Sequence, residues 1–330
     1  MKKWMVFLLS LMFAGSLAGC GIFTGKQNQV ITIVLDWTPN TNHTGIFVAQ
    51  AKGYFEAAGV TVEVVQPPED GAVPLVASGK AQFGVSFQDA LAPAFVGEAA
   101  MPVTAVAAMI QHNTSGILSR AGEGMDTPRG LEGRKYATWD LEVEKATLRD
   151  VMAADGGDFQ LVELIPSTVT DEVSVLRSGS VDAIWVFYGW AGVACEVAGL
   201  DTDYFAFADI HPVFDYYTPV LIGNNAWLEE HADTARAVLA ALSKGYTYAA
   251  QHPQEAADIL LDAVPELHAS SDLVYASQSY LSPAYIADAA RWGEFDPVRW
   301  AAFFRWLNEN NLLEEDIDPD AGFTNDYLPR

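Results

Sequence analysis

The sequence is poor in cysteine and in basic residues. Its 330 residues include two cysteines, too few for a disulfide framework or a thiolate zinc site. Lysine and arginine number 18 against 43 aspartates and glutamates, which gives a formal charge of −25. Binding to nucleic acid needs a basic surface that displaces counterions, and adsorption to anionic lipid also needs basic residues. The composition therefore argues against both kinds of partner.

The motifs of common catalytic sites are also lacking. The chain has no P-loop, no complete G-x-G-x-x-G, no G-x-S-x-G and no H-E-x-x-H. Its six histidines are scattered, and no two of them lie four residues apart. We therefore expect no metal site, no cofactor and no catalytic residues, although a triad could still be assembled from distant positions.

The first twenty residues have the proportions of a bacterial secretion signal. Two lysines in residues 1–3 precede an apolar run over residues 4–17, which is too short to span a membrane. The run ends in Leu-Ala-Gly-Cys20, which resembles the lipobox of bacterial lipoproteins. We expect a signal peptide over residues 1–19, lipidation (palmitate) on Cys20 and a flexible tether over residues 20–29.

This lipid would be the sole anchor, holding the body of the protein at the extracytoplasmic face of the cell membrane. The alternatives are an ordinary signal with an incidental cysteine and an uncleaved core helix.

Downstream of the tether, short β-branched runs alternate with helical periodicity. Expected strands lie at residues 30–35, 61–65, 81–85, 103–110, 135–138, 161–165, 183–187 and 217–222. The alternation predicts an α/β fold with doubly wound sheets, and its rhythm restarts after residue 110. We expect two lobes with a ligand cleft between them. Lobe 1 would comprise residues 30–112 and 218–330, and lobe 2 residues 113–217.

Polar and aromatic side chains crowd the loop that follows the first expected strand. They are Asp36, Trp37, Asn40, Asn42 and His43. In doubly wound sheets, ligands bind outside the carboxyl ends of strands, so this loop should line the cleft. An indole, two amides, a carboxylate and an imidazole can stack on a flat heterocycle and hydrogen-bond its edges. The alternative is an ordinary turn in which Asp36 caps the next helix.

Other strand ends carry candidates of the same kind. They are Gln88 after the third strand, Trp139 and Glu142 after residues 135–138, Tyr188, Trp190 and Glu196 after residues 183–187, and Tyr216 before residues 217–222. Glu142 could instead be first-turn charge of a helix. Trp185 and Phe187 alternate within a strand and are expected in the core. The set favours a neutral or weakly basic aromatic ligand over a phosphate, which would need arginine or a glycine-rich helix start.

Residues 35–45 resemble the signature of substrate-binding lipoproteins for thiamine pyrimidine precursors. Supporting segments are residues 53–55, 188–190, 215–219 and 323–329. The resemblance extends from about Val30 to the end of the chain. It implies a type II periplasmic-binding-protein fold and an ABC permease as membrane partner, and we expect a monomer. The implied ligand is N-formyl-4-amino-5-aminomethyl-2-methylpyrimidine or a hydroxymethylpyrimidine relative.

Other functions stay open within the same superfamily. Riboflavin-binding relatives have a similar Asn-Thr-Asn-His loop. Yeast-type thiamine pyrimidine synthases carry a lysine that holds pyridoxal phosphate and a sacrificial histidine, and the matching positions here are Ser86 and Ala90. Residues 213–217 replace the cysteine-rich motif of those synthases. Thiaminase I uses a cysteine nucleophile, but Cys195 lies in an apolar stretch typical of a buried thiol. The resemblance therefore favours a binding protein over an enzyme.

Overall fold

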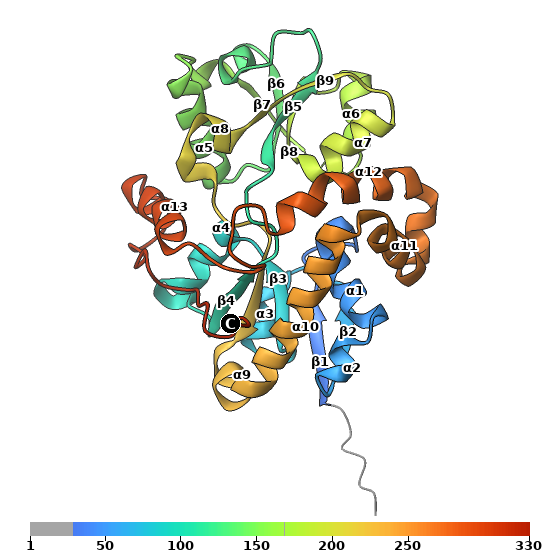
Figure 1. Ribbon diagram of the computed structural model, residues 1–330. Helices are drawn as coiled ribbons and strands as arrows, with labels where there is room; N and C mark the ends of the chain where they lie inside the picture. Colours follow the sequence, from blue (N-terminus) through green and yellow to red (C-terminus); the bar gives the residue numbers. More distant parts are fainter. Residues whose placement is uncertain (1–28, 168) are drawn as a thin grey trace, which may run out of the picture.

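The computed structural model describes residues 29–167 and 169–330. The expected signal peptide, Cys20 and residues 20–28 of the expected tether lie outside this part of the chain. Two five-stranded sheets, each flanked by helices, form the two halves of the molecule (Figure 1). The expected α/β architecture is confirmed. Among the described residues, no helix has the length and apolarity needed to cross a membrane.

The first sheet lies in the lower half of Figure 1 and has the strand order β2-β1-β3-β10-β4. Its strands are β1 (Gln29–Val34), β2 (Val60–Val65), β3 (Phe83–Ser86), β4 (Val103–Ala108) and β10 (Val220–Asn224). Strand β1 pairs in parallel with both β2 and β3, whereas β10 runs antiparallel to β3 and β4. The polypeptide that leaves β1 and the one that leaves β3 therefore emerge at the same edge.

The second sheet has the order β7-β6-β8-β5-β9. Its strands are β5 (Ser115–Arg120), β6 (Lys135–Thr138), β7 (Glu163–Pro166), β8 (Ala183–Phe187) and β9 (Thr202–Ala206). Strand β6 is parallel to β7 and β8, and β5 is antiparallel to β8 and β9. We call the half built on the first sheet lobe 1 and the half built on the second sheet lobe 2. The chain passes between them after β4 and again before β10. The exact boundaries, lobe 2 over residues 113–217, stay a prediction.

Helices cover both sheets, and those after β10 form the C-terminal third. They are α1 (Thr44–Ala51), α2 (Tyr54–Ala57), α3 (Val73–Ala77), α4 (Gln88–Leu91), α5 (Glu142–Ala154), α6 (Glu172–Ser178), α7 (Val193–Val197), α8 (Phe207–Ile210), α9 (Asn225–Glu230), α10 (Ala232–Gln251), α11 (Pro253–Ala263), α12 (Ser271–Leu281) and α13 (Pro297–Glu309).

Helix α10 packs closely on α1 because two glycines permit it. A Cβ on Gly245 would lie 2.1 Å from the carbonyl oxygen of Gly45. A Cβ on Gly45 would lie 2.3 Å from the ring of Tyr246. The buried Tyr246 ring also stacks on Trp292 at 4.5 Å between ring centroids. This packing fixes the C-terminal segment against the helix that follows the β1 loop.

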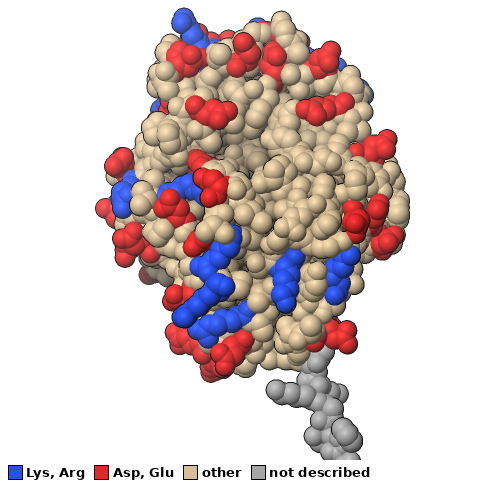
Figure 2. Space-filling view, viewed as in Figure 1, with Lys and Arg blue, Asp and Glu red and all other residues tan. Residues whose placement is uncertain are grey.

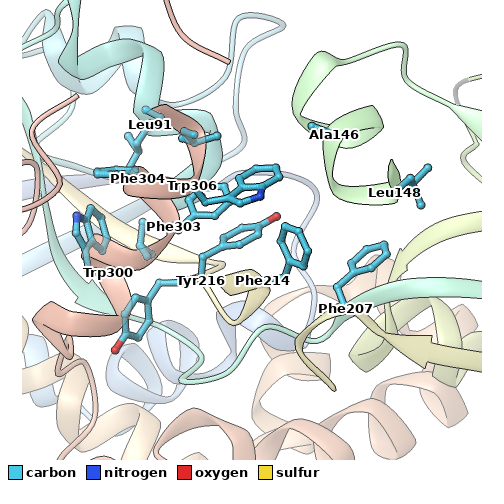
Figure 3. Close-up of a cluster of buried hydrophobic side chains, with 14 of the residues drawn as sticks. Leu91, Ala146, Leu148, Phe207, Phe214, Tyr216, Trp300, Phe303, Phe304 and Trp306 are labelled. Atoms are coloured by element: carbon cyan, nitrogen blue, oxygen red, sulfur yellow. The ribbon is translucent and has the colours of Figure 1, made fainter. Parts of the chain in front are cut away.

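The tail also contacts lobe 2, which the sequence did not indicate. Figure 3 shows the aromatic cluster in which α13 meets residues from the second crossing. Phe303 stacks on Tyr216 at 4.1 Å, and Trp306 meets Phe214 edge-on at 5.1 Å. The indole of Trp306 donates a hydrogen bond to Asp150 of α5 at 2.6 Å. The tail is therefore packed on both lobes.

Helix α12 joins the two lobes through Ser277, whose side chain is fully buried. Its hydroxyl lies 2.5 Å from the hydroxyl of Thr41, in the loop after β1. The same hydroxyl donates a hydrogen bond to the carbonyl of Gly189, after β8. One side chain thus connects the loop after β1 of the first sheet with the turn after β8 of the second.

Acidic side chains are spread around the visible face instead of forming one patch, whereas lysine and arginine gather over its lower half (Figure 2). The middle of this face, between the lobes, carries few charged side chains. Dispersed acidity of this kind keeps a protein from associating non-specifically and does not by itself mark a ligand site.

Candidate functional site

A pocket of about 260 Å³ lies between the lobes, among residues that follow or end β1, β3, β6 and β8. Lobe 1 contributes Asp36, Trp37, Asn40, Asn42, Phe87, Thr218 and Pro219. Lobe 2 contributes Trp139, Glu172, Trp185, Val186, Phe187, Trp190 and Ala191. Carboxyl ends of strands at a change of strand order are the usual ligand site of such sheets.

Two larger hollows, of about 520 and 760 Å³, lie beside the crossing segments. Both include His112, Asp215 and Arg299, whose side chains already pair with one another. His112 Nδ1 is 2.7 Å from Asp215 Oδ2, and Arg299 Nη1 is 3.1 Å from the same oxygen. These groups bind the hinge segments together, so the aromatic pocket is the candidate site.

The loop after β1 is held rigid by hydrogen bonds among its own residues. The Oδ1 of Asn40 accepts from the Asn42 backbone N–H at 2.8 Å, and its Nδ2 donates to the Thr38 carbonyl. The Nδ1 of His43 accepts from the Asn40 N–H at 3.2 Å, and its Nε2 lies 2.6 Å from Asp36 Oδ1. A neutral imidazole that donates through Nε2 satisfies both contacts.

The backbone of this loop is also attached to the C-terminal segment. The hydroxyl of Tyr285 donates to the Thr41 carbonyl at 2.6 Å, and that of Tyr246 donates to the Asn42 carbonyl at 2.8 Å. Because both tyrosine rings are buried, the loop cannot move without disturbing the core. The half-buried Asn42 amide, which lines the pocket, is left available to a ligand.

The opposite wall is organised by Glu144, a buried carboxylate at the start of α5. It accepts hydrogen bonds from Tyr136 at 2.7 Å, from Thr138 at 3.0 Å and from the backbone N–H groups of Trp139 and Leu141. Asp140, which lies between Trp139 and Leu141, has a left-handed backbone conformation with a φ of 65°. These contacts fix the backbone that carries Trp139.

Strand β8 ends in a five-residue π-helical turn, Tyr188–Gly192. A Cβ on Gly189 would lie 2.6 Å from the side chain of Leu281, so glycine allows α12 to approach this turn. The turn brings Trp190 and Ala191 to the pocket. Wide turns of this type are frequent at functional sites.

The pocket walls are mainly aromatic. Trp139 lies 5.9 Å from Trp185 between ring centroids, and Phe87 stacks on Phe187 at 5.9 Å across the two lobes. Trp37 and Trp139 belong to opposite lobes, and their side chains are 47% and 45% exposed. Half-exposed indoles on facing walls can sandwich a planar ring when the lobes approach.

The ionisable groups that line the pocket are both acidic, Asp36 and Glu172. Burial raises the pKa of the Glu172 carboxyl. Of the residues described by the structure, neither lysine nor arginine lines this pocket. The arrangement therefore suits a neutral or cationic ring and opposes a phosphate.

Several of the expected site residues do not line the pocket. Gln88 is fully buried, and its amide binds the Trp300 carbonyl and the Tyr217 N–H. His43 is also fully buried and lies behind the loop, against Asp36. Tyr216 is a core residue stacked on Phe303. Each of these side chains has a structural role that the local sequence did not indicate.

Three further expected residues, Glu142, Tyr188 and Glu196, also do not line the pocket. Their side chains contact other residues or solvent instead. Glu142 is exposed and pairs with Lys145 at 3.1 Å, as expected from its alternative role in the first helical turn. Tyr188 packs on Tyr204 at 4.5 Å between ring centroids and donates to Glu196, which is exposed. The remaining expected residues, Asp36, Trp37, Asn40, Asn42, Trp139 and Trp190, are brought together in the pocket.

Two pocket residues were expected in the core. Trp185 and Phe187 are half-buried and line the pocket, because β8 is the middle strand of its sheet and its end faces the cleft. Their position at a strand end was the available signal. Thr218 and Pro219 belong to residues 215–219, which the sequence analysis singled out. Phe87 and Glu172 come from segments whose approach depends on the fold, and neither was predicted.

Cys195 is fully buried, and burial raises the pKa of its thiol to about 11. A thiol in this state is protonated near neutral pH and is a poor nucleophile. Among residues 29–167 and 169–330, no group of three His, Cys, Asp or Glu side chains is arranged to hold a metal ion.

Comparison with known sequences gives a family match. The family described as "NMT1/THI5 like" matches residues 40–256. A formylaminopyrimidine-binding protein of Halalkalibacterium halodurans is 28% identical, over 98% of each chain. The 4-amino-5-hydroxymethyl-2-methylpyrimidine phosphate synthase THI13 of Saccharomyces cerevisiae is 24% identical, over 74% of each chain.

Comparison with solved structures shows the fold. The periplasmic aliphatic sulphonate binding protein SsuA of Escherichia coli aligns with a TM-score of 0.68 at 15% identity, over 88% of this chain and 90% of SsuA. The periplasmic nitrate-binding protein NrtA of Synechocystis aligns with a TM-score of 0.63 at 13% identity, over 91% of this chain and 87% of NrtA. The expected periplasmic-binding-protein fold is confirmed.

Proposed function

The chain belongs to the NMT1/THI5-like family, and on this premise we propose that it is the solute-binding protein of an ABC importer for a thiamine pyrimidine precursor. The relative of similar length that is named for binding formylaminopyrimidine supports this ligand class. The fold shared with periplasmic binding proteins supports the transport role.

The observation that carries the proposal is the aromatic pocket between the lobes. Trp37 and Trp139 face it from opposite sides, and Trp190 completes the lobe 2 wall. Indole faces stack on any planar heterocycle, while the Asn42 amide and the Asp36 carboxylate offer polar contacts to its edges. Lobe closure would then bury the ring between the two walls, because the ligand favours the closed state over the open one.

The pocket has room for a single ring, and a neighbouring hollow of about 320 Å³ shares Asp36 and Phe87 with it. The pocket's own volume of about 260 Å³ is below the range of about 300–1,000 Å³ typical of sites for drug-sized ligands. A substituted pyrimidine is smaller than such ligands, whereas riboflavin carries three fused rings and a ribityl chain. Riboflavin therefore remains the alternative ligand to be tested.

The test is calorimetry of the purified mature chain with the formylaminopyrimidine, thiamine and riboflavin in turn. We expect saturable 1:1 binding of the formylaminopyrimidine and much weaker or no binding of riboflavin. A Trp190→Ala variant should weaken binding, whereas Leu161→Ala, at an exposed site away from the pocket, should not. Absence of heat with the pyrimidine, or tighter binding of riboflavin, would overturn the proposal.

We further propose that the protein acts as a monomer at the extracytoplasmic face of the cell membrane, anchored by lipid on Cys20 and delivering its ligand to a permease. The support is the lipobox-like sequence before Cys20. A Cys20→Ser variant expressed in a bacterial host should lose metabolic labelling with palmitate and leave the membrane fraction. Retention of label and of membrane association would contradict the anchor.

We propose that binding takes place without catalysis. Ser86 and Ala90 stand where the resemblance predicts the lysine and the histidine of the synthases, and neither side chain can form a Schiff base. A thiaminase-like reaction would require a cysteine nucleophile, and the thiol of Cys195 is buried. Incubation with thiamine and a nucleophilic amine should therefore give no product. Turnover that a Cys195→Ser change abolishes would establish an enzyme.

A further inference from the structure

The two carboxylates that line the pocket lie on opposite lobes and differ in their partners. Asp36 belongs to lobe 1, and its Oδ1 is 2.6 Å from the Nε2 of His43. This contact commits one of its oxygens to the loop. Glu172 belongs to lobe 2 and is the first residue of α6. In the described part of the chain, no other residue forms an ion pair with its carboxylate, and its own backbone N–H is the hydrogen-bond donor that acts on it.

Among the residues that the structure describes, no positive charge pairs with Glu172. The neighbouring titratable groups are Asp171 on its own helix, the Cys195 thiol of α7 and Asp36 across the pocket. Arg177 of α6 acts on Asp171 and Cys195. Burial raises the pKa of Glu172, and the charge of Asp171 adds to this increase. The half-buried carboxylate lines the pocket and is available to pair with a positively charged ligand.

A pyrimidine with an exocyclic amine can supply that partner. Protonation of the ring nitrogen beside the amine creates two parallel N–H donors on one planar edge, with the charge shared between them. A carboxylate accepts both, in the same forked geometry that it forms with an arginine. The aromatic walls would contact the faces of the ring and leave this edge free for Glu172.

We propose that Glu172 recognises the ligand as an N-protonated aminopyrimidine and serves as its counter-ion from lobe 2. This inference rests on the proposed function, since it concerns the ligand edge read in the same pocket. It also assigns a specificity: a 4-oxopyrimidine with the same substituents carries a carbonyl in place of the amine and repels the carboxylate at that position.

The inference is tested by proton uptake measured with calorimetry at about pH 8, well above the usual carboxyl range. At this pH the free ligand is neutral and the free carboxylate is ionised. Titrations of the formylaminopyrimidine in two buffers with different ionisation enthalpies should show uptake of about one proton per complex. The 4-oxo analogue should bind at least tenfold more weakly and take up no proton.

Glu172→Gln is the informative variant because it keeps the shape of the side chain and removes the ionisable group. We expect affinity for the aminopyrimidine to fall by about 10–100-fold, as for loss of a charge-assisted hydrogen bond. Proton uptake should disappear, and binding of the oxo analogue should be unchanged or tighter. Glu163→Gln is the matched control, since Glu163 is an exposed lobe 2 carboxylate outside the pocket. Its affinity and proton uptake should equal those of the native chain.

The outcomes separate this inference from the function on which it rests. If the native chain binds the pyrimidine without proton uptake, or if Glu172→Gln keeps both affinity and uptake, the role of Glu172 is overturned and the proposed function stands. If the native chain does not bind the pyrimidine, both are overturned. Thermal unfolding of each variant checks that the folded state is retained.

Discussion

The Nε2 of His43 lies 2.6 Å from the Oδ1 of Asp36. The His43 imidazole, which lies between Asp36 and Asn40, is fully buried. The contact closes the loop after β1 on itself, because the Nδ1 of the same ring accepts the Asn40 N–H. The residue that the sequence indicated as a ligand contact is therefore a positioning residue.

A His43→Ala change should destabilise the protein and weaken ligand binding together. It leaves the Asn40 N–H and one Asp36 oxygen without partners, which costs about 1–3 kcal/mol for each buried polar group. The loop would lose its fixed geometry, and affinity should fall about tenfold or more. Urea denaturation and calorimetry measure the two effects. His268→Ala, at an exposed site, should change neither, and an unaltered His43→Ala variant would contradict this role.

A Trp139→Ala change should weaken binding with little loss of stability. The indole is 45% exposed, so the folded state without ligand gains little from it. Stacking of an aromatic ring on a base contributes about 1–3 kcal/mol, which corresponds to about 5–150-fold in the dissociation constant. Calorimetry with the formylaminopyrimidine measures the change, and Trp139→Phe should recover part of it. Leu141→Ala, at a site that is 53% exposed, is the control expected to bind normally.

The same substitution at the two glutamates at the start of α5 should have a large effect at Glu144 and almost none at Glu142. Glu144→Gln places an amide nitrogen among donors that the carboxylate satisfies, including the Tyr136 hydroxyl and the Trp139 N–H. We expect the free energy of unfolding to fall by about 2 kcal/mol or more. Glu142→Gln removes an exposed contact with Lys145 and should stay within about 0.5 kcal/mol of the native chain. Equal effects in urea denaturation would contradict the assignment.

Stability should depend on pH through His112 at the hinge. Its hydrogen bond to Asp215 raises its pKa above 6.5, and the charge of Asp215 and the contact with Asp288 act in the same direction. Burial and the nearby Arg299 act in the opposite direction. A raised pKa stabilises the folded state fully below the unfolded value, and this contribution is lost as the pH rises through the folded value.

The measurement is thermal unfolding of the native chain and of His112→Asn between about pH 5 and pH 9. The difference between their midpoints should be largest near pH 5–6 and should shrink as the pH rises above 6.5. The exposed His268→Asn variant should show no such trend. A difference that grows with pH would refute the role of His112.

The sequence predicted the features that depend on local pattern. The β-branched run at residues 30–35 and the polar loop after it indicated a strand and a strand-end site, and both lie where expected. The edge strand β9 (Thr202–Ala206) was missed, because only one of its residues is buried and the pattern there is weak. The helical spacing of apolar residues over 45–58 corresponds to two helices, α1 and α2, which are separated at Gly53 with a φ of 69°.

The site could be predicted only in part, because burial of a polar side chain depends on distant segments. Gln88 follows its strand as Asp36 does, yet its amide is bound by residues more than 120 positions away. Glu172 belongs to a segment whose local sequence reads as an ordinary helix start, and only the approach of the two lobes makes it a pocket residue. Strand ends were the right place to search, but their side chains could not be assigned an orientation from the sequence.

The hydroxyl of Ser277 contacts a loop from each sheet, so α12 holds the two lobes together at one border of the cleft. A solute would then enter the cleft at the border remote from α12. The distance between the lobes at that border would report whether the pocket is occupied. A permease that contacts both lobes there could distinguish the liganded protein from the unliganded one without contacting the ligand.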